Sequence, residues 1–266
     1  MTKAMIGVLY SNEVLRLIRS RKLKVMLALM FLPVLVYFFS HESITEYSTK
    51  AFQISLQVTF SNYMVSFWAS VIGQLMVIIL MSELLASEID RGTMRLLLTK
   101  PIRKSEILFG KFFAGMTGLA VIFGVPYLIL HVYMVLLYKR GFGGFTATIG
   151  DVLFALGVTL LVLGTLGAFS MFLSVMLSRP LYASLASFGV IFVAQFILPQ
   201  LPFFDDPERF TLNYQLGVLL KKGFTLHTGL DAYKGDPTTS ALFFGAVMLL
   251  SLIFALIGLY RREYGG

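Results

Sequence analysis

Long uncharged apolar runs constrain this chain more than any other sequence feature. Residues 51–82, 112–138, 152–178, 180–204 and 237–260 contain no charged residue, and a shorter uncharged run covers 25–39. A helix needs about 20 mostly apolar residues to cross roughly 30 Å of hydrocarbon, so each long run can span a bilayer. With 57% hydrophobic and only 14% charged residues, the chain is too apolar for a soluble domain of 266 residues. We therefore predict an all-α polytopic membrane protein with six transmembrane helices.

Two of the six spans need a separate argument. Only Arg179 is charged in residues 152–204, yet one helix of that length would run to roughly 80 Å, so we predict two helices joined by a tight turn. The run 25–39 is short enough to be a signal-peptide core, but its charged leader is long and no cleavage pattern follows. We expect a retained short span, with Lys22 and Lys24 reaching the membrane surface.

The distribution of Lys and Arg predicts the orientation in the bilayer. If the N-terminus is cytoplasmic, the inside segments hold most of the 22 Lys and Arg residues, as the positive-inside rule requires. We therefore expect a multi-pass protein of the cytoplasmic (cell) membrane, with both termini cytoplasmic and residues 40–50, 139–151 and 205–236 outside. Within the extracytoplasmic segment 205–236, residues 211–226 are apolar enough for a short interfacial or membrane-dipping helix, or else form a covered loop.

Residues 11–24 mix apolar and basic side chains before the first span. Ser11 or Asn12 can cap a helix whose apolar residues alternate with basic ones. The apolar set is Val14, Leu15, Leu17, Ile18 and Leu23, and the basic set is Arg16, Arg19, Arg21 and Lys22. We expect an amphipathic helix at the membrane interface. The alternative is a basic flank that only sets the topology.

Residues 83–111 form a charged segment between the second and third apolar runs. The second span is expected to continue through Glu88 and to end at Gly92. Residues 93–99 carry Met94, Leu97 and Leu98 at helical spacing, which predicts a short amphipathic helix parallel to the membrane. Pro101 favours the start of a new helix that runs into the third span.

This segment resembles the one that follows the second span in type-2 ABC transporter permeases. The matching residues, in order and spacing, are Glu88, Gly92, Thr93, Leu96, Leu97, Leu98, Pro101, Arg103 and Lys111. The resemblance implies a coupling helix that sits in a cleft of a separate nucleotide-binding ATPase subunit. It also implies a second permease subunit, in a homodimer or a heterodimer. The residues predicted to contact the ATPase are Glu88, Arg91, Gly92, Thr93, Met94, Arg95, Leu97, Leu98, Pro101, Arg103 and Lys104. The alternative for the charged ones is contact with anionic lipid headgroups.

ATP-binding chemistry is missing from the sequence. Gly110 and Lys111 are followed by Phe112 instead of Ser or Thr, and no glycine stands five positions earlier, so they are not a phosphate-binding P-loop. We therefore expect no catalytic residue, no metal and no cofactor in this chain, with ATP and Mg²⁺ in the partner subunit. The net charge of +8 is accounted for by membrane orientation, so no nucleic-acid partner is expected.

A few polar and small residues lie within the apolar runs. Asn62, Gln74, His131 and Gln195 either line a substrate path or only hydrogen-bond between helices. Gly110, Ala114 and Gly118 are small residues four apart, which lets another helix approach closely, either within the chain or across a dimer interface.

Taken together, the sequence predicts a single transmembrane permease domain over residues 1–266. We expect the non-catalytic membrane subunit of an ATP-driven ABC exporter, with the translocation path formed by a dimer. One alternative is an ABC-type subunit that transmits force to an extracytoplasmic partner without transport. The other is a stand-alone secondary transporter or channel, although a charged residue deep within the spans, which such carriers usually need, is missing.

Overall fold

The computed structural model describes residues 2–40, 48–94, 102–200, 209 and 211–262, and these residues contain helices and no strand. Six helical segments among them are long and apolar enough to cross a membrane, which confirms the predicted number. They are Arg21–Ser40, Val71–Asp90, Lys104–Leu137, Gly141–Leu177, Pro180–Ile197 and Pro237–Arg261. The first consists of α2 (Arg21–Met30) and α3 (Leu32–Ser40), and the fifth of α9 (Pro180–Phe192) with a π-helical turn, Val193–Ile197.

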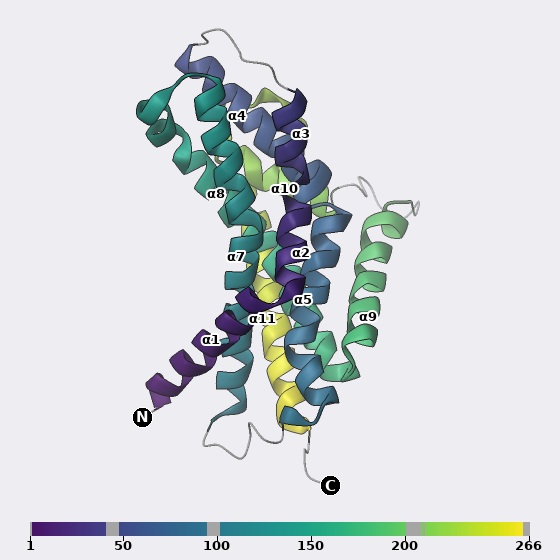
Figure 1. Ribbon diagram of the computed structural model, residues 1–266. Coiled ribbons are helices and arrows are strands. Elements are labelled where there is room, and N and C mark those ends of the chain that lie inside the picture. The colour runs from purple at the N-terminus through teal and green to yellow at the C-terminus, as the bar shows by residue number, and fades with distance from the viewer. Residues whose placement is uncertain (1, 41–47, 95–101, 201–208, 210, 263–266) are drawn as a thin grey trace.

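The bundle is centred on α8 (Gly141–Leu177), which packs against both α5 (Val71–Asp90) and α11 (Pro237–Arg261). The N-terminal helix α1 (Thr2–Arg19) packs on α7 (Lys104–Leu137) and leaves the bundle at an angle (Figure 1). The end of α5, the start of α7 and both chain termini lie at one end of the bundle, which we call the terminal end. Helices α3, α4 (Thr49–Tyr63) and α10 (Leu212–Lys221) gather at the opposite end (Figure 1).

One candidate span begins within the apolar run 51–82, as predicted, but the run also holds a separate helix before that span. The chain forms α4, a π-helical turn at Met64–Trp68, and then α5, whose N-cap Ser70 is extended. At the break before α5, the amide of Gln74 donates to the carbonyl of Ala69 at 2.8 Å. The indole of Trp68 donates to the carbonyl of Met30 at the end of α2, at 3.0 Å, which ties the π-helical turn to the first span. Because the Gln74 bond replaces a helical one, an apolar run that looks unbroken holds two helices.

The predicted fourth span, residues 152–178, belongs to a helix that starts earlier and includes most of residues 139–151, whose position outside the membrane stays a prediction. Helix α8 already begins at Gly141, after a turn in which Lys139 and Gly141 both have positive φ. The 34 residues of α7 and the 37 of α8 run to about 51 and 55 Å, well beyond the hydrocarbon thickness. Asp151 lies inside α8, where it accepts hydrogen bonds from the amides of Gln57 (3.0 Å) and Gln53 (3.4 Å) on α4. The charged residue Asp151 therefore lies within a helix, although it borders the uncharged run 152–178 in the sequence.

The N-terminal amphipathic segment is divided differently from the prediction of one helix over residues 11–24. Helix α1 ends at Arg19, and α2 begins at Arg21. Ser20 is the extended N-cap of α2, and its hydroxyl accepts a hydrogen bond from the Leu23 amide at 3.2 Å. Ser11 and Asn12, the predicted capping residues, lie inside α1 and do not cap a helix, and Lys22 and Lys24 belong to the first span. The position of α1 at a membrane interface stays a prediction.

Two predicted connections are confirmed. Helices α8 and α9 are joined by a tight turn in which Ser178 has φ of 64° and Pro180 opens α9. Within residues 211–226, α10 forms a short helix, and a 3-10 turn, Thr228–Ala232, follows. Asp236 then caps α11 and accepts hydrogen bonds from the Thr239 amide (2.9 Å) and hydroxyl (2.8 Å), which hold the pKa of that carboxyl below its usual range.

The junction between the π-helical turn and α5 predicts a stability effect. A β-carbon at Gly73 would collide with the backbone carbonyl of Trp68, which cannot rotate away as a side chain can. We expect Gly73→Ala to lower the free energy of unfolding by about 1–3 kcal/mol, as overpacking does. Thermal or denaturant unfolding in detergent measures it. Gly189→Ala is the matched control, because nothing lies within 4 Å of a β-carbon there. Equal effects of the two substitutions would contradict the prediction.

Candidate functional site

A fully buried ammonium group lies at the terminal end of the bundle. Lys111 of α7 has no exposed side-chain surface, and its Nζ atom lies 2.7 Å from Glu88 Oε1 and 2.8 Å from Glu13 Oε1. Glu88 comes from α5 and Glu13 from α1, so three helices meet at this atom. A buried charge is tolerated only when close partners replace its hydration. The two carboxylates supply those partners.

Arg16 completes the arrangement from the solvent side. Its Nη2 atom lies 2.8 Å from Glu13 Oε2, and its Nη1 atom lies 3.4 Å from Glu88 Oε1. About half of its side chain is exposed, whereas both carboxylates are almost fully buried. Two acids and two bases balance in charge, and we call Glu13, Arg16, Glu88 and Lys111 the Lys111 cluster.

Close helix packing holds α1 against α7 beside this cluster. The position a β-carbon would take on Gly110 lies 3.1 Å from Leu9, and the one on Gly118 lies 3.6 Å from Leu17. The hydroxyls of Tyr10 and Thr117 are 2.7 Å apart. The small residues of α7 therefore accommodate α1 of the same chain. Of the two readings of this sequence pattern, packing within the chain is the one observed.

The first half of the predicted ATPase-contacting set begins with Glu88, which is buried inside α5 in the Lys111 cluster, and continues directly after that helix. Gly92 has φ of 71°, so the chain turns where the sequence predicted. Arg91 is exposed, and the Thr93 hydroxyl donates to the Glu88 carbonyl at 3.3 Å. Met94 is fully buried in the chain's own core and is therefore not available on the surface as an anchor. Arg95, Leu97, Leu98 and Pro101 lie outside the described residues, so the coupling helix stays a prediction.

The second half of the set opens α7. The predicted helix start at Pro101 is corrected to Lys104, because the Glu106 carboxylate accepts a hydrogen bond from the Arg103 amide at 3.0 Å and caps the helix there. Lys104 donates to the carbonyls of Leu259 (2.8 Å) and Arg262 (3.1 Å) at the end of α11. The guanidinium of Arg262 in turn donates to the Ser178 hydroxyl in the turn between α8 and α9.

The four polar residues predicted along a substrate path have different surroundings. Gln74 and Gln195 exchange amide hydrogen bonds of 2.7 and 3.4 Å between α5 and the π-helical turn after α9. His131 of α7 is buried and hydrogen-bonds Thr148 of α8 at 2.8 Å. Asn62 is exposed on α4. Hydrogen bonding between helices accounts for Gln74, Gln195 and His131, and a path along them stays a prediction.

Sequence reasoning missed half of the Lys111 cluster. Glu88 and Lys111 belong to the motif that carried the family resemblance, whereas Glu13 and Arg16 were noted only as part of a basic amphipathic segment. One signal was available, because Glu13 is the only acidic residue before the first span. An isolated acid such as Glu13 is a candidate ion-pair partner for a lysine, such as Lys111, that lies within a long apolar helix and is therefore buried.

These features define a helical multi-pass membrane protein with a charged segment between its second and third spans. The N-terminal helix contacts this segment through the Lys111 cluster. A family model described as "ABC-2 family transporter protein" matches residues 8–209, so the chain belongs to the ABC-2 family of transporter proteins. Membership makes it the membrane permease subunit of an ABC transporter and implies association with an ABC ATPase subunit. The comparison does not favour a stand-alone carrier or a force-transmitting subunit. Among the curated proteins, none matches this sequence.

The burial of Lys111 predicts a large cost for removing its charge. Lys111→Met would leave the two buried carboxylates of Glu13 and Glu88 with only the half-exposed Arg16, among the residues that the structure describes, as a basic partner. We expect the free energy of unfolding to fall by about 3–5 kcal/mol. Lys221→Met is the control, because Lys221 and Asp231 form an exposed ion pair whose loss costs at most about 1 kcal/mol.

A triple variant separates charge from packing in the same experiment. Adding Glu13→Gln and Glu88→Gln to Lys111→Met removes the uncompensated charges, so part of the lost stability should return. Denaturant unfolding in detergent measures all four proteins. A triple variant no more stable than Lys111→Met alone would contradict the prediction, because the loss could then not be assigned to uncompensated carboxylates.

Proposed function

We propose that the chain is the permease subunit of an ATP-driven exporter in the cell membrane, with both termini cytoplasmic. A second permease subunit completes the translocation path, and a separate nucleotide-binding ATPase docks on residues 83–111. ATP and Mg²⁺ bind to that ATPase. The observation that carries the proposal is the Lys111 cluster, which joins the two helices on either side of the docking segment to each other and to α1.

Mechanical coupling requires that a push on the docking segment move whole helices. Glu88 lies near the end of α5, and Lys111 lies two turns into α7. Their ion pair therefore holds the end of α5 against the start of α7, on the two sides of the connecting residues. A displacement there would tilt α5 and α7 together as a rigid body, instead of being absorbed at the hinge. Lys104 extends the same connection to the end of α11.

The charge distribution supports a cytoplasmic terminal end. Most Lys and Arg residues of the described segments near the membrane lie at that end, on α1, α2, the ends of α5 and α11, and the start of α7. Positively charged flanks favour the cytoplasmic side. The same end would then meet a cytoplasmic ATPase, as ATP-driven export requires.

The path itself is proposed to run beside the Gln74–Gln195 pair. These amides are the described polar side chains that join α5 to the segment after α9, in otherwise apolar surroundings. A second copy of the chain facing this side would enclose a path with amide groups in its wall.

Docking on residues 83–111 predicts which charges hold the ATPase. The tagged full-length chain is purified from its native membranes and the ATPase is detected by photolabelling with azido-ATP. We expect Arg91→Ala combined with Arg103→Ala to lower the co-purified label by at least about tenfold, because interfacial charge pairs are lost. Lys222→Ala combined with Lys234→Ala removes the same charge at the opposite end and should leave the label unchanged. Equal retention in both variants would contradict docking at this segment.

Transport is tested with the purified complex in vesicles. An exporter hydrolyses ATP and moves solute out of the cytoplasmic-side compartment, so ATP added to inside-out vesicles should drive accumulation. Hydrolysis without movement of any solute, with the ATPase still bound, would instead support transmission of force to an extracytoplasmic partner.

A further inference from the structure

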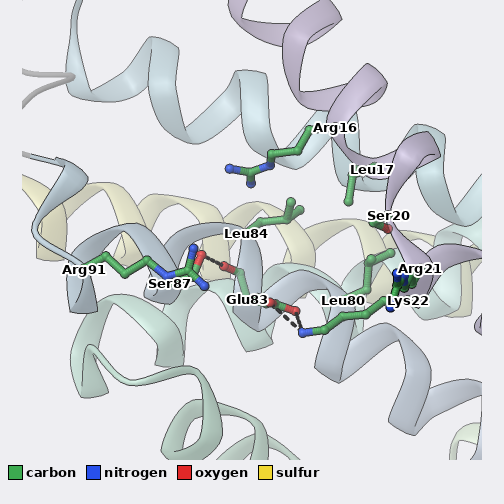
Figure 2. Close-up of a pocket in the computed structure, with 10 residues that line it drawn as sticks. All are labelled: Arg16, Leu17, Ser20, Arg21, Lys22, Leu80, Glu83, Leu84, Ser87 and Arg91. Atoms are coloured by element: carbon green, nitrogen blue, oxygen red, sulfur yellow. Dashed lines mark hydrogen bonds and ion pairs between the residues drawn. The ribbon is translucent and has the colours of Figure 1, made fainter.

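A charged cavity lies where α1, α2 and α5 meet at the terminal end. Its volume is about 390 Å³, and Figure 2 shows the side chains around it. The polar wall consists of Arg16, Ser20, Arg21, Lys22, Glu83, Ser87 and Arg91. Leu17, Leu80 and Leu84 form the apolar floor. The cavity overlaps the start of the proposed docking segment, from which Glu83, Leu84, Ser87 and Arg91 line it, while its remaining lining residues come from α1, from α2 with its N-cap Ser20, and from Leu80 of α5.

Positive charge exceeds negative charge in this cavity. Lys22 neutralises Glu83, with Nζ 2.6 Å from Oε1, and Arg16 is held in the Lys111 cluster. Arg21 and Arg91 are exposed and form no ion pair with any other residue that the structure describes. Arg21 and Arg91 lie at opposite ends of the cavity (Figure 2), so each guanidinium is available to an anion at its own end, and guanidinium binds phosphate through paired hydrogen bonds.

An apolar groove continues from the charged cavity along the outside of the bundle. It lies between α5 and α9, has a volume of about 400 Å³, and shares Lys22 and Glu83 with the charged cavity. Its remaining walls are Leu75, Ile78, Ile79, Pro180, Leu181, Ser184, Leu185 and Phe188. A ligand that fits both parts must carry a negative group at one end and a hydrocarbon chain at the other.

The two cavities also lie at the right depth for a lipid. Arg21 is the first residue of the first candidate span, and Glu83 lies near the end of the second. The charged part is therefore at the level where apolar spans meet the headgroup region, and the groove runs toward the hydrocarbon. Basic pockets between membrane helices are a recurrent site for anionic headgroups.

We propose that these two cavities bind an anionic phospholipid of the surrounding leaflet. Its phosphate lies against Arg21, with Lys22 and Arg91 at the rim, and one acyl chain occupies the groove between α5 and α9. The bound lipid joins α1 and α2 to α5 and α9 at the end of the bundle where the Lys111 cluster lies. This proposal does not depend on the identity of the ATPase or of the transported solute.

The headgroup part is tested by titrating the detergent-purified full chain with phosphatidylglycerol and counting bound lipids by native mass spectrometry. Arg21→Gln should weaken binding about fivefold, because one basic side chain near a surface phosphate contributes about that factor. Arg19→Gln is the matched control: it removes the same charge two residues earlier, and Arg19 does not line the cavity. Phosphatidylcholine should bind more weakly to the wild type and equally to both variants. Equal phosphatidylglycerol binding by both variants would overturn the proposal.

The acyl-chain part is tested by filling the groove. Leu185→Trp should reduce phosphatidylglycerol binding, whereas Leu249→Trp, at an equally exposed position on α11, should not. Soluble glycerol 1-phosphate should compete poorly. Competition as strong as that of the lipid would show a simple phosphate site and overturn the lipid assignment.

Two further outcomes would assign the cavities to other occupants. If Leu185→Trp lowers the dimer fraction and leaves lipid binding intact, a second copy of the chain covers the groove, and the proposal fails. If Arg21→Gln releases the azido-ATP-labelled subunit and leaves lipid binding intact, the charged cavity belongs to the ATPase, and the proposal again fails. The docking test shares Arg91 with this site, so the single variant Arg103→Ala, outside the cavity, keeps ATPase docking and lipid binding distinguishable.

Discussion

The ion pairs of the buried Lys111 ammonium group are the constraint on which the terminal end of this protein depends. An ammonium group without hydration is costly to bury, so its carboxylate partners must lie within hydrogen-bonding distance. Glu88 and Glu13 meet that requirement from α5 and α1, at 2.7 and 2.8 Å. Because the requirement is geometric, it sets how far α1 can slide along α7 and how α5 and α7 lie against each other. Apolar packing alone would permit many such arrangements, since lipid and leucine offer helices similar surroundings.

Further polar contacts extend this connection across the terminal end. Lys104 joins the start of α7 to the last carbonyls of α11, and Arg262 joins the end of α11 to the turn after α8. Polar contacts thus link α1 with the ends of α5, α7, α8 and α11 at the terminal end of the bundle. For the membrane subunit of an ABC transporter this arrangement has a clear use. If the ATPase docks on residues 83–111 as proposed, movement that it imposes there would reach several helices through these contacts.

The opposite end of the bundle uses polar side chains differently. There, Gln57 donates to Asp151 at 3.0 Å and accepts from the Leu226 amide at 3.0 Å, so a single residue of α4 joins α8 to the segment after α10. Trp68 likewise takes up a carbonyl at the end of α2. These contacts allow α4 to be a separate helix and α8 to continue past a charged residue. Both departures of the helices from the bounds of the apolar runs are accompanied by such side-chain contacts.

The sequence by itself determined the class of the protein, the number of spans, the turns at Gly92 and Ser178, and the family. Those features follow from apolar length and from local backbone preferences, which act over a few neighbouring residues. Only the tertiary structure decided where apolar runs break and which charges are buried together. Lys111 and Glu88 are 23 residues apart and Lys111 and Glu13 are 98 apart, so no local pattern connects them. The energy that selects such pairs arises only when helices from distant parts of the chain exclude water around them.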